Sequence, residues 1–148
     1  MKPFILAFIV MITNTALSQD LNSISKMIIE KEKSALERWN NGDPSGFLEI
    51  SAKDVVYFDP FTEQRLNGLE NLRKLYESIR GQIKVDKYEM INPKVQSVDN
   101  MAVLTYNLDS YSGSALEKWN CTEVYRFDDK KWKIIQTHWS FTKPRIQN

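Results

Sequence analysis

Hydrophobic residues recur at helical spacing in the first half of the chain and alternate with polar residues in the second half. Residues 23–40 are expected to form a helix, because hydrophobic residues fall on one side of it and charged residues on the other. The hydrophobic residues are Ile24, Ile28, Ala35 and Trp39. Gly42 is expected to end this helix.

Two further helices and five strands complete the expected elements. Asp43 caps a second, short helix with Pro44 in its first turn, where the missing amide hydrogen costs nothing. A third helix follows Gly68, with an apolar face made of Leu69, Leu72, Leu75, Tyr76 and Ile79. Hydrophobic and alternating patterns predict strands over residues 55–59, 85–98, 101–111, 119–127 and 132–141.

Helices come first and strands follow, an order that is typical of an α+β domain. A long antiparallel sheet with helices on one face must curve around them to bury both surfaces. The curvature is expected to leave a cavity between the sheet and the helices. Side chains on the concave face of the sheet, near its open end, are therefore the candidates for a functional site.

The last predicted strand carries the chain's only histidine. Regular alternation places Trp132, Ile134, Gln136, His138 and Ser140 on one face, which is apolar at one end and polar at the other. This arrangement is expected of a strand that runs from a core into a pocket.

The preceding strand is expected to pair with the last one through a two-residue turn at Asp129-Lys130. The register gives the pairs Phe127–Trp132, Tyr125–Ile134, Glu123–Gln136, Cys121–His138 and Trp119–Ser140. Glu123 then lies alone among apolar side chains. A buried carboxylate must find a partner, take up a proton or border a water-filled cavity. Glu123 is therefore the first candidate site residue.

The beginning of the chain has the pattern of a secretory signal, with Lys2, an apolar run over residues 4–12, and small residues at Ala16 and Ser18. The run is too short for a stable membrane anchor, and no lipid-attachment cysteine follows it. We expect a signal peptide over residues 1–18, a single domain over residues 19–148, and a secreted or periplasmic location.

Charge and cysteine content narrow the classes of partner. Lys and Arg total 20 and Asp and Glu total 19, so removing Lys2 with the signal leaves 19 of each and a net charge of zero. This balance gives no indication of nucleic-acid or anionic-membrane binding. One histidine and scattered acids lack the spacing of a metal site. Cys121, the only cysteine, is expected to be buried and unreactive.

The predicted mature chain resembles the NTF2-like superfamily, in particular its SnoaL-like and DUF4440-like branches. The matching phrases are Trp39-Asn-Asn-Gly-Asp43, Val56-Tyr-Phe-Asp-Pro60, Asn67-Gly68, Thr122-Glu-Val-Tyr-Arg-Phe-Asp128 and Trp132-Lys-Ile-Ile-Gln-Thr-His-Trp-Ser140. The resemblance implies a cone of three helices and a strongly bent antiparallel sheet that encloses a pocket. It specifies activity poorly, because this scaffold hosts isomerases, cyclases, dehydratases, hydrolases and non-catalytic members.

Among catalytic members, the chain is similar to the ketosteroid isomerases. By that resemblance Asp59, directly before Pro60, is the general base, and Glu123 is a protonated hydrogen-bond donor. The first-helix tyrosine of their oxyanion hole falls at Ala35, which has no donor, and losing such a donor typically costs about a hundredfold or more in rate. His138, Tyr57 or Tyr106 could supply a donor from another wall of the pocket.

Three interpretations follow. The preferred one is an exported domain whose pocket binds a small, partly apolar ligand without breaking a bond. The first alternative is a cofactor-independent isomerase, cyclase or hydrolase with Asp59 as base, Glu123 as donor, and His138 as donor or proton relay. In the second alternative, Glu123 and His138 form a buried structural pair without a ligand.

The pocket is expected to contact its ligand through Tyr57, Tyr106, Trp119, Trp39, Ser140 and Gln136. No cofactor or metal is expected. The outward face of the last strands is predicted to be apolar, with Ile135, Val124, Trp139 and Phe141. Such a face indicates a homodimer formed through the outer side of the sheet.

Overall fold

The computed structural model describes residues 4–143, with side chains described from Leu21 onward. A long helix, α1 (Phe4–Asn40), is followed by α2 (Ser45–Ile50), and α3 (Leu69–Ser78) comes after the first two strands. The predicted signal peptide lies outside the residues with described side chains and stays a prediction. In the described part of the chain, no helix is both long and apolar enough to cross a membrane.

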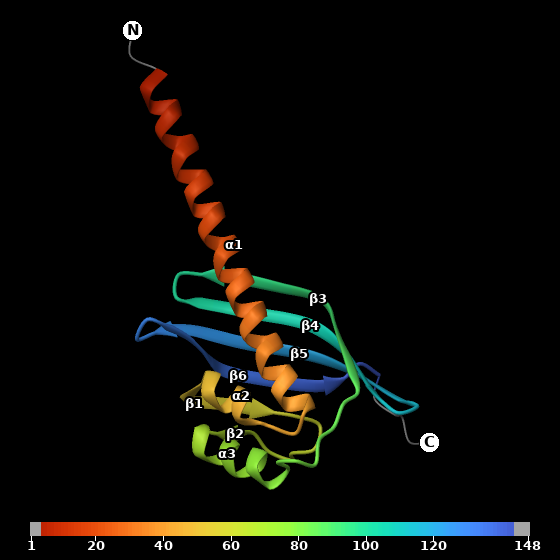
Figure 1. Cartoon of the computed structure of the whole chain (residues 1–148). Coiled ribbons are helices and arrows are strands. Elements are labelled where there is room, and N and C mark those ends of the chain that lie inside the picture. The colour runs from red at the N-terminus through yellow and green to blue at the C-terminus, as the bar shows by residue number, and fades with distance from the viewer. Residues whose placement is uncertain (1–3, 144–148) are drawn as a thin grey trace.

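The described strands form one six-stranded sheet in the order β2-β1-β6-β5-β4-β3. Their bounds are β1 (Ser51–Phe58), β2 (Leu66–Asn67), β3 (Lys87–Val98), β4 (Met101–Ser112), β5 (Ala115–Asp128) and β6 (Lys131–Phe141). Neighbouring strands are antiparallel except β1 and β6, which are parallel. Figure 1 shows α1 crossing the sheet, with α2 and α3 near β1 and β2. The predicted α+β class is confirmed; the sequence pattern did not indicate β2 or the parallel pair.

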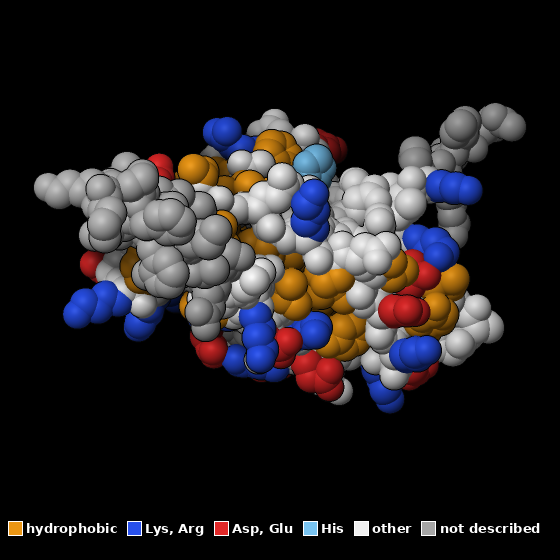
Figure 2. All heavy atoms as spheres, turned by 90° about the horizontal axis from the view of Figure 1, so that it is seen from above, with side chains coloured by type: hydrophobic (Ala, Val, Ile, Leu, Met, Phe, Trp, Pro, Cys, Tyr) orange, Lys and Arg blue, Asp and Glu red, His pale blue; other side chains and the backbone are white. Residues whose placement is uncertain are grey.

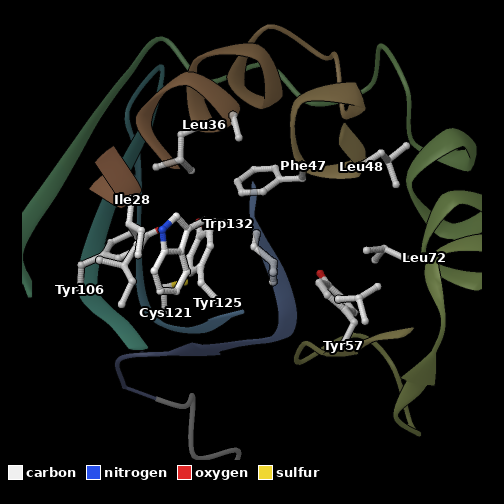
Figure 3. Close-up of a cluster of buried hydrophobic side chains, with 14 of the residues drawn as sticks. Ile28, Leu36, Phe47, Leu48, Tyr57, Leu72, Tyr106, Cys121, Tyr125 and Trp132 are labelled. Atoms are coloured by element: carbon white, nitrogen blue, oxygen red, sulfur yellow. The ribbon is translucent and has the colours of Figure 1, made fainter. Parts of the chain in front are cut away.

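The core lies between the helices and the concave face of the sheet. Ile28 and Leu36 of α1 and Phe47 of α2 meet Tyr125 and Ile134 from the sheet, and all five are at least 95% buried. Figure 3 shows these layers of aliphatic and aromatic side chains meeting across the fold. This burial is the main source of stability, because apolar area removed from water contributes about 25 cal/mol per Å².

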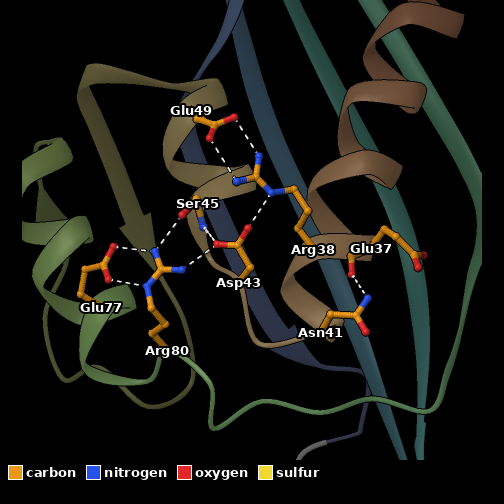
Figure 4. A network of polar contacts seen from close by, with 8 residues as sticks. All are labelled: Glu37, Arg38, Asn41, Asp43, Ser45, Glu49, Glu77 and Arg80. Atoms are coloured by element: carbon orange, nitrogen blue, oxygen red, sulfur yellow. Dashed lines mark hydrogen bonds and ion pairs between the residues drawn. The ribbon is translucent and has the colours of Figure 1, made fainter.

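Charged side chains hold the helical segments together outside the core. Arg38 of α1 donates to both Asp43 and Glu49, and Arg80, after α3, donates to Asp43 and Glu77. Asp43 therefore links α1 to the end of α3 at the entrance to α2, as Figure 4 shows. Hydrogen bonds from Ser45 first, and then from Arg38 and Arg80, hold the pKa of Asp43 well below its usual range, so the network stays charged at neutral pH.

The hairpin between β5 and β6 turns at Asp129-Lys130, as predicted. Both residues have positive φ, 47° and 61°, as a tight two-residue hairpin turn requires. Phe127 pairs with Trp132 and Tyr125 with Ile134, and then a bulge interrupts the register. Beyond the bulge Val124 pairs with Gln136, so Ile135 is an extra residue in β6.

The bulge reverses the alternation that the sequence suggests for the rest of β6. The pairs Glu123–Gln136, Cys121–His138 and Trp119–Ser140 are wrong; the observed partners are Thr137, Trp139 and Phe141, respectively. One extra residue moves every later side chain to the opposite face. Thr137, Trp139 and Phe141 therefore face inward, whereas the prediction placed Trp139 and Phe141 outside.

Candidate ligand-binding site

A cavity of about 450 Å³ lies between the helices and the concave face of the sheet. Most of its walls are hydrophobic or aromatic, including Leu36, Trp39, Phe47, Phe61, Leu75, Leu108, Trp119 and Trp139. The polar groups in the wall are few and include Asn40, Tyr57, Asp59 and Ser110. Volume and lining both match small-molecule sites, which occupy roughly 300–1,000 Å³ and are mainly apolar.

Asp59 lies at the end of β1 and lines the cavity. Its Oδ1 accepts hydrogen bonds from the backbone amides of Phe61, at 2.9 Å, and Thr62, at 2.8 Å. Its Oδ2 accepts one from the Tyr57 hydroxyl at 3.1 Å. The protein therefore fixes the orientation of both carboxylate oxygens. The Tyr57 hydroxyl occupies one hydrogen-bonding position of Oδ2, so that position is not open to a ligand.

Tyr57 contacts both Asp59, through its hydroxyl, and a second buried tyrosine, Tyr76, through its ring. The rings of Tyr57 and Tyr76 meet edge to face with centroids 5.7 Å apart. Burial first, and then the negative charge of Asp59, raise the pKa of Tyr57. Tyr57 therefore keeps its proton at neutral pH and donates it in the hydrogen bond to Asp59.

Asn40, the last residue of α1, is the buried polar group that the sequence interpretation missed. It is only 5% exposed and lines the cavity, and its Nδ2 has no hydrogen-bond partner among the described residues. Leaving a buried amide unpaired typically costs about 1–3 kcal/mol. Asn40 follows Leu36 by four residues and therefore lies on the core side of α1. This spacing could have identified Asn40 as a buried polar residue from the sequence.

Glu123 is fully buried, and its neighbour is Glu32 of α1, which is also fully buried. The Tyr125 hydroxyl lies 2.9 Å from Oε2 of each carboxyl group. Tyr106 donates to Oε1 of Glu32 at 2.5 Å, and Thr137 donates to Oε1 of Glu123 at 3.0 Å. Neither glutamate belongs to the cavity lining.

The glutamate pair must hold at least one proton. The Tyr125 hydroxyl has a single hydrogen but contacts two carboxyl oxygens, so one contact needs a protonated carboxyl group that donates. Burial first, and then the negative charge of Glu32, raise the pKa of Glu123 well above its usual range. Because the groups are in contact, the proton belongs to the pair.

Glu32, Cys121 and Glu123 are the described residues whose donor atoms could surround one metal ion, within 4.8 Å of one another. All four carboxyl oxygens already have tyrosine or threonine partners. Burial also raises the pKa of the Cys121 thiol, which disfavours the thiolate that metals bind. The arrangement fits a shared proton better than a cation. The predicted burial of Cys121 is confirmed.

His138 lies outside the cavity, on the outer face of the sheet. Its side chain is exposed, and its ring packs against Phe58 with centroids 5.7 Å apart. Figure 2 shows the histidine on the surface. The predicted buried pair of Glu123 and His138 is therefore wrong, and a role for His138 as donor or relay in the cavity is contradicted. The bulge at Ile135 is the physical reason.

The other predicted ligand contacts divide into two groups. Tyr57, Trp39 and Trp119 line the cavity together with Asp59. Gln136 and Ser140 point outward with His138, and Asn120 donates to the Ser140 hydroxyl at 3.2 Å. Tyr106 lies behind the wall, where its ring packs edge to face on Trp139 and its hydroxyl binds Glu32.

Ala35, the position of the missing oxyanion tyrosine, packs against α2 instead of the cavity. A Cβ atom added at Gly46 would lie 2.9 Å from the Cα of Ala35, so the two helices touch at this point. The close approach requires a small residue on each helix. Ala35 therefore supplies no hydrogen-bond donor to the cavity, as its side chain predicted.

The chain belongs to the SnoaL-like domain family, which matches residues 33–144. It also resembles a solved "putative ketosteroid isomerase" from Parabacteroides distasonis, with 52% sequence identity and a TM-score of 0.76, over 82% of this chain and 89% of that one. The comparison with curated proteins gives no match.

More distant structures share the fold alone. An NTF2-like protein of unknown function from Pseudomonas putida is 19% identical, with a TM-score of 0.75 over 84% of this chain and 91% of that one. The association domain of CaMKII from C. elegans is 15% identical, with a TM-score of 0.68 over 80% of this chain and 96% of that one. The NTF2-like fold expected from the sequence is confirmed.

Proposed function

We propose that the cavity binds a small, partly apolar molecule and that its few polar groups orient this ligand without breaking a bond. The observation that carries the proposal is the cavity of about 450 Å³, which is walled by aromatic rings and still open after the core has packed. Folding gains nothing from an unfilled apolar space, because the side chains that line it lose packing contacts. A ligand would restore those contacts.

The test is to fill the cavity with a larger side chain. Leu75 lines the cavity, whereas its neighbour Lys74 is exposed. Nile red, a neutral apolar dye, is expected to bind the wild type and Lys74→Trp equally and Leu75→Trp at least tenfold more weakly, as measured by fluorescence titration. Equal binding to all three proteins, or none to the wild type, would contradict the proposal.

Proton transfer is the second candidate function, and the placement of Asp59 favours it. Asp59 lines the cavity, as a general base must, and the Parabacteroides protein described above carries an isomerase designation. The predicted donor role of Glu123 is less well supported, because Glu123 lies outside the lining. In this version the donor is Nδ2 of Asn40, because the single hydroxyl hydrogen of Tyr57 is already donated to Asp59.

Hydrogen–deuterium exchange at the methyl group of methyl naphthyl ketone tests this second function. If Asp59 is a base, the wild type accelerates exchange, Asp59→Asn abolishes the acceleration, and Asp128→Asn, an exposed control, retains it. Exchange at the uncatalysed rate in the wild type would exclude proton abstraction from this ketone and would leave the binding function standing.

We also propose that two copies associate through the outer face of the sheet. Val103, Val124 and Ile135 are only partly buried there, and Phe58 beside them is 38% exposed. Light scattering is expected to give a dimer for the wild type and for Met27→Lys, an exposed position on α1 away from the sheet, but a monomer for Val124→Lys. A monomeric wild type would contradict the proposal.

Export is proposed from the signal pattern at residues 1–18. The protein recovered outside the cytoplasm should begin at Gln19, as mass spectrometry can show. Leu6→Arg interrupts the apolar run and should keep the full-length chain in the cytoplasm. Recovery of the uncleaved wild type from the cytoplasm would contradict the proposal.

A further inference from the structure

We propose that Asn40 recognises the ligand, and that the ligand offers its Nδ2 group a neutral hydrogen-bond acceptor such as the carbonyl oxygen of a ketone or lactone. This inference rests on the proposed function, that the cavity binds a small, partly apolar molecule. It adds the chemical class of the ligand and the residue that selects it.

The side chain of Asn40 behaves differently from an ordinary helix-end asparagine. Among the buried side-chain nitrogen and oxygen atoms of the described residues, Nδ2 of Asn40 is the one without a partner. Its neighbour Asn41 is exposed, and its Nδ2 donates to the backbone carbonyl of Glu37 at 2.8 Å. Asn41 shows that an asparagine at this end of α1 can pair its side-chain amide with a backbone carbonyl of the same helix. The amide of Asn40 has no such partner in the described part of the chain and lies in the cavity.

The backbone around Asn40 is held so that the amide stays in the cavity. The amide of Val85 donates to the carbonyl of Asn40 at 3.0 Å, and that of Gly81 donates to Gly42 at 2.9 Å. The chains touch at these glycines, because a Cβ on Gly42 would lie 3.0 Å from the Cα of Gly81. The segment with Ile83 and Val85 also lines the cavity, so the donor is fixed before a ligand arrives.

The charges of the lining indicate that the acceptor is neutral. Asp59 and Glu117 are the charged side chains among the lining residues, and no lysine, arginine or histidine accompanies them. A carboxylate or phosphate ligand would be repelled by these acids and would find no cation. An uncharged carbonyl oxygen avoids this repulsion and suits a neutral amide donor.

Two probes of the same shape distinguish the contribution of the Asn40 hydrogen bond to binding from that of the apolar cavity. Methyl naphthyl ketone has a carbonyl oxygen where its hydrocarbon isostere, isopropenylnaphthalene, has a methylene group. Calorimetric titration of the wild type should show about tenfold tighter binding of the ketone, the effect of one neutral hydrogen bond. Asn40→Leu should bind both probes equally, and Asn41→Leu, the same change at an exposed position, should keep the preference.

The outcomes distinguish this inference from the function on which it rests. Equal binding of both probes to the wild type, or a preference that survives in Asn40→Leu, overturns the role of Asn40 and leaves cavity binding intact. Binding of neither probe overturns both. The side-chain amide resonances of Asn40 in the wild type supply a measurement without a variant: a shift with the ketone but not with the hydrocarbon is expected, and identical responses overturn the inference.

Discussion

At the scale of single residues, Glu123 shows how a buried neighbour changes the role of a side chain. The resemblance to ketosteroid isomerases implied an acid that touches the substrate. In the structure Glu123 instead shares hydrogen bonds with Glu32 behind the cavity wall, with Tyr125 between the two carboxyl groups. The pair is therefore a protonated structural unit of the core, and its protonation should be visible in stability.

Glu123 should make the protein less stable as pH rises. Below its ordinary pKa of 4.5, the carboxyl group is protonated in both folded and unfolded chains. Above that pH the unfolded chain releases the proton while the folded protein keeps it, so the free energy of unfolding falls until the raised folded pKa is passed. Denaturant unfolding at several pH values should show this decline in the wild type and a smaller one in Glu123→Gln.

The matched control for this titration is Glu63→Gln, which removes an exposed carboxylate. Its difference from the wild type should stay nearly constant across the same pH range. A Glu123→Gln profile that runs parallel to the wild type would show that Glu123 is not protonated in the folded protein.

Removing the Tyr125 hydroxyl should destabilise the glutamate pair. Tyr125→Phe keeps the ring but leaves two buried carboxyl oxygens short of a partner, with an expected loss of about 1–3 kcal/mol in the free energy of unfolding. Tyr111→Phe is the control, because the ring of Tyr111 contacts Lys87 at the surface. Equal losses in the free energy of unfolding for Tyr125→Phe and Tyr111→Phe, measured with denaturant, would contradict the role of the Tyr125 hydroxyl between the two glutamates.

Residue spacing could have located Glu32 and Asn40 but not the orientation of His138. Glu32 follows Ile28 by four residues on the buried side of α1, where a carboxyl group needs a partner. His138 was misplaced because regular alternation was assumed through β6. The apolar pair Ile134-Ile135 fits an uninterrupted strand as well as a bulged one, so hydrophobic pattern alone does not reveal the bulge.

At the scale of elements, the β5–β6 hairpin positions the cavity wall. The tight turn fixes the first pairs of the register, and the bulge at Ile135 then brings Thr137 to Glu123 and Trp139 to the cavity. Helix and strand order were predictable from periodicity. The short strand β2 and the parallel contact of β1 with β6 depend on tertiary packing, which carries little local signal.

Lys130→Gly should stabilise the hairpin. Lys130 has φ 61°, a left-handed conformation that is unfavourable for a residue with a Cβ and open to glycine. We expect a gain of about 0.5–1 kcal/mol in the free energy of unfolding, measured by thermal or denaturant melting. The same change at the adjacent strand residue Lys131 should destabilise the protein. A loss at both positions would contradict the turn geometry.

At the scale of the whole molecule, the fold was predictable and the content of the cavity was not. Helices on one face of a curved sheet require a space between the layers, and the order of the motifs indicated the NTF2-like family. The cavity lining also depends on Phe61, Gln82 and Ile83, which lie outside the predicted helices and strands and outside the observed ones. Their placement results from long-range contacts such as Val85 with Asn40.

The four tryptophans provide the most direct test of the central claim, that the cavity is a ligand site. Trp39, Trp119 and Trp139 line it, whereas Trp132 is buried elsewhere in the core. Two-dimensional NMR of the indole N–H groups during titration with methyl naphthyl ketone should show saturable shifts for the three cavity tryptophans and none for Trp132. Equal shifts of all four, or none at saturating ketone, would contradict the account.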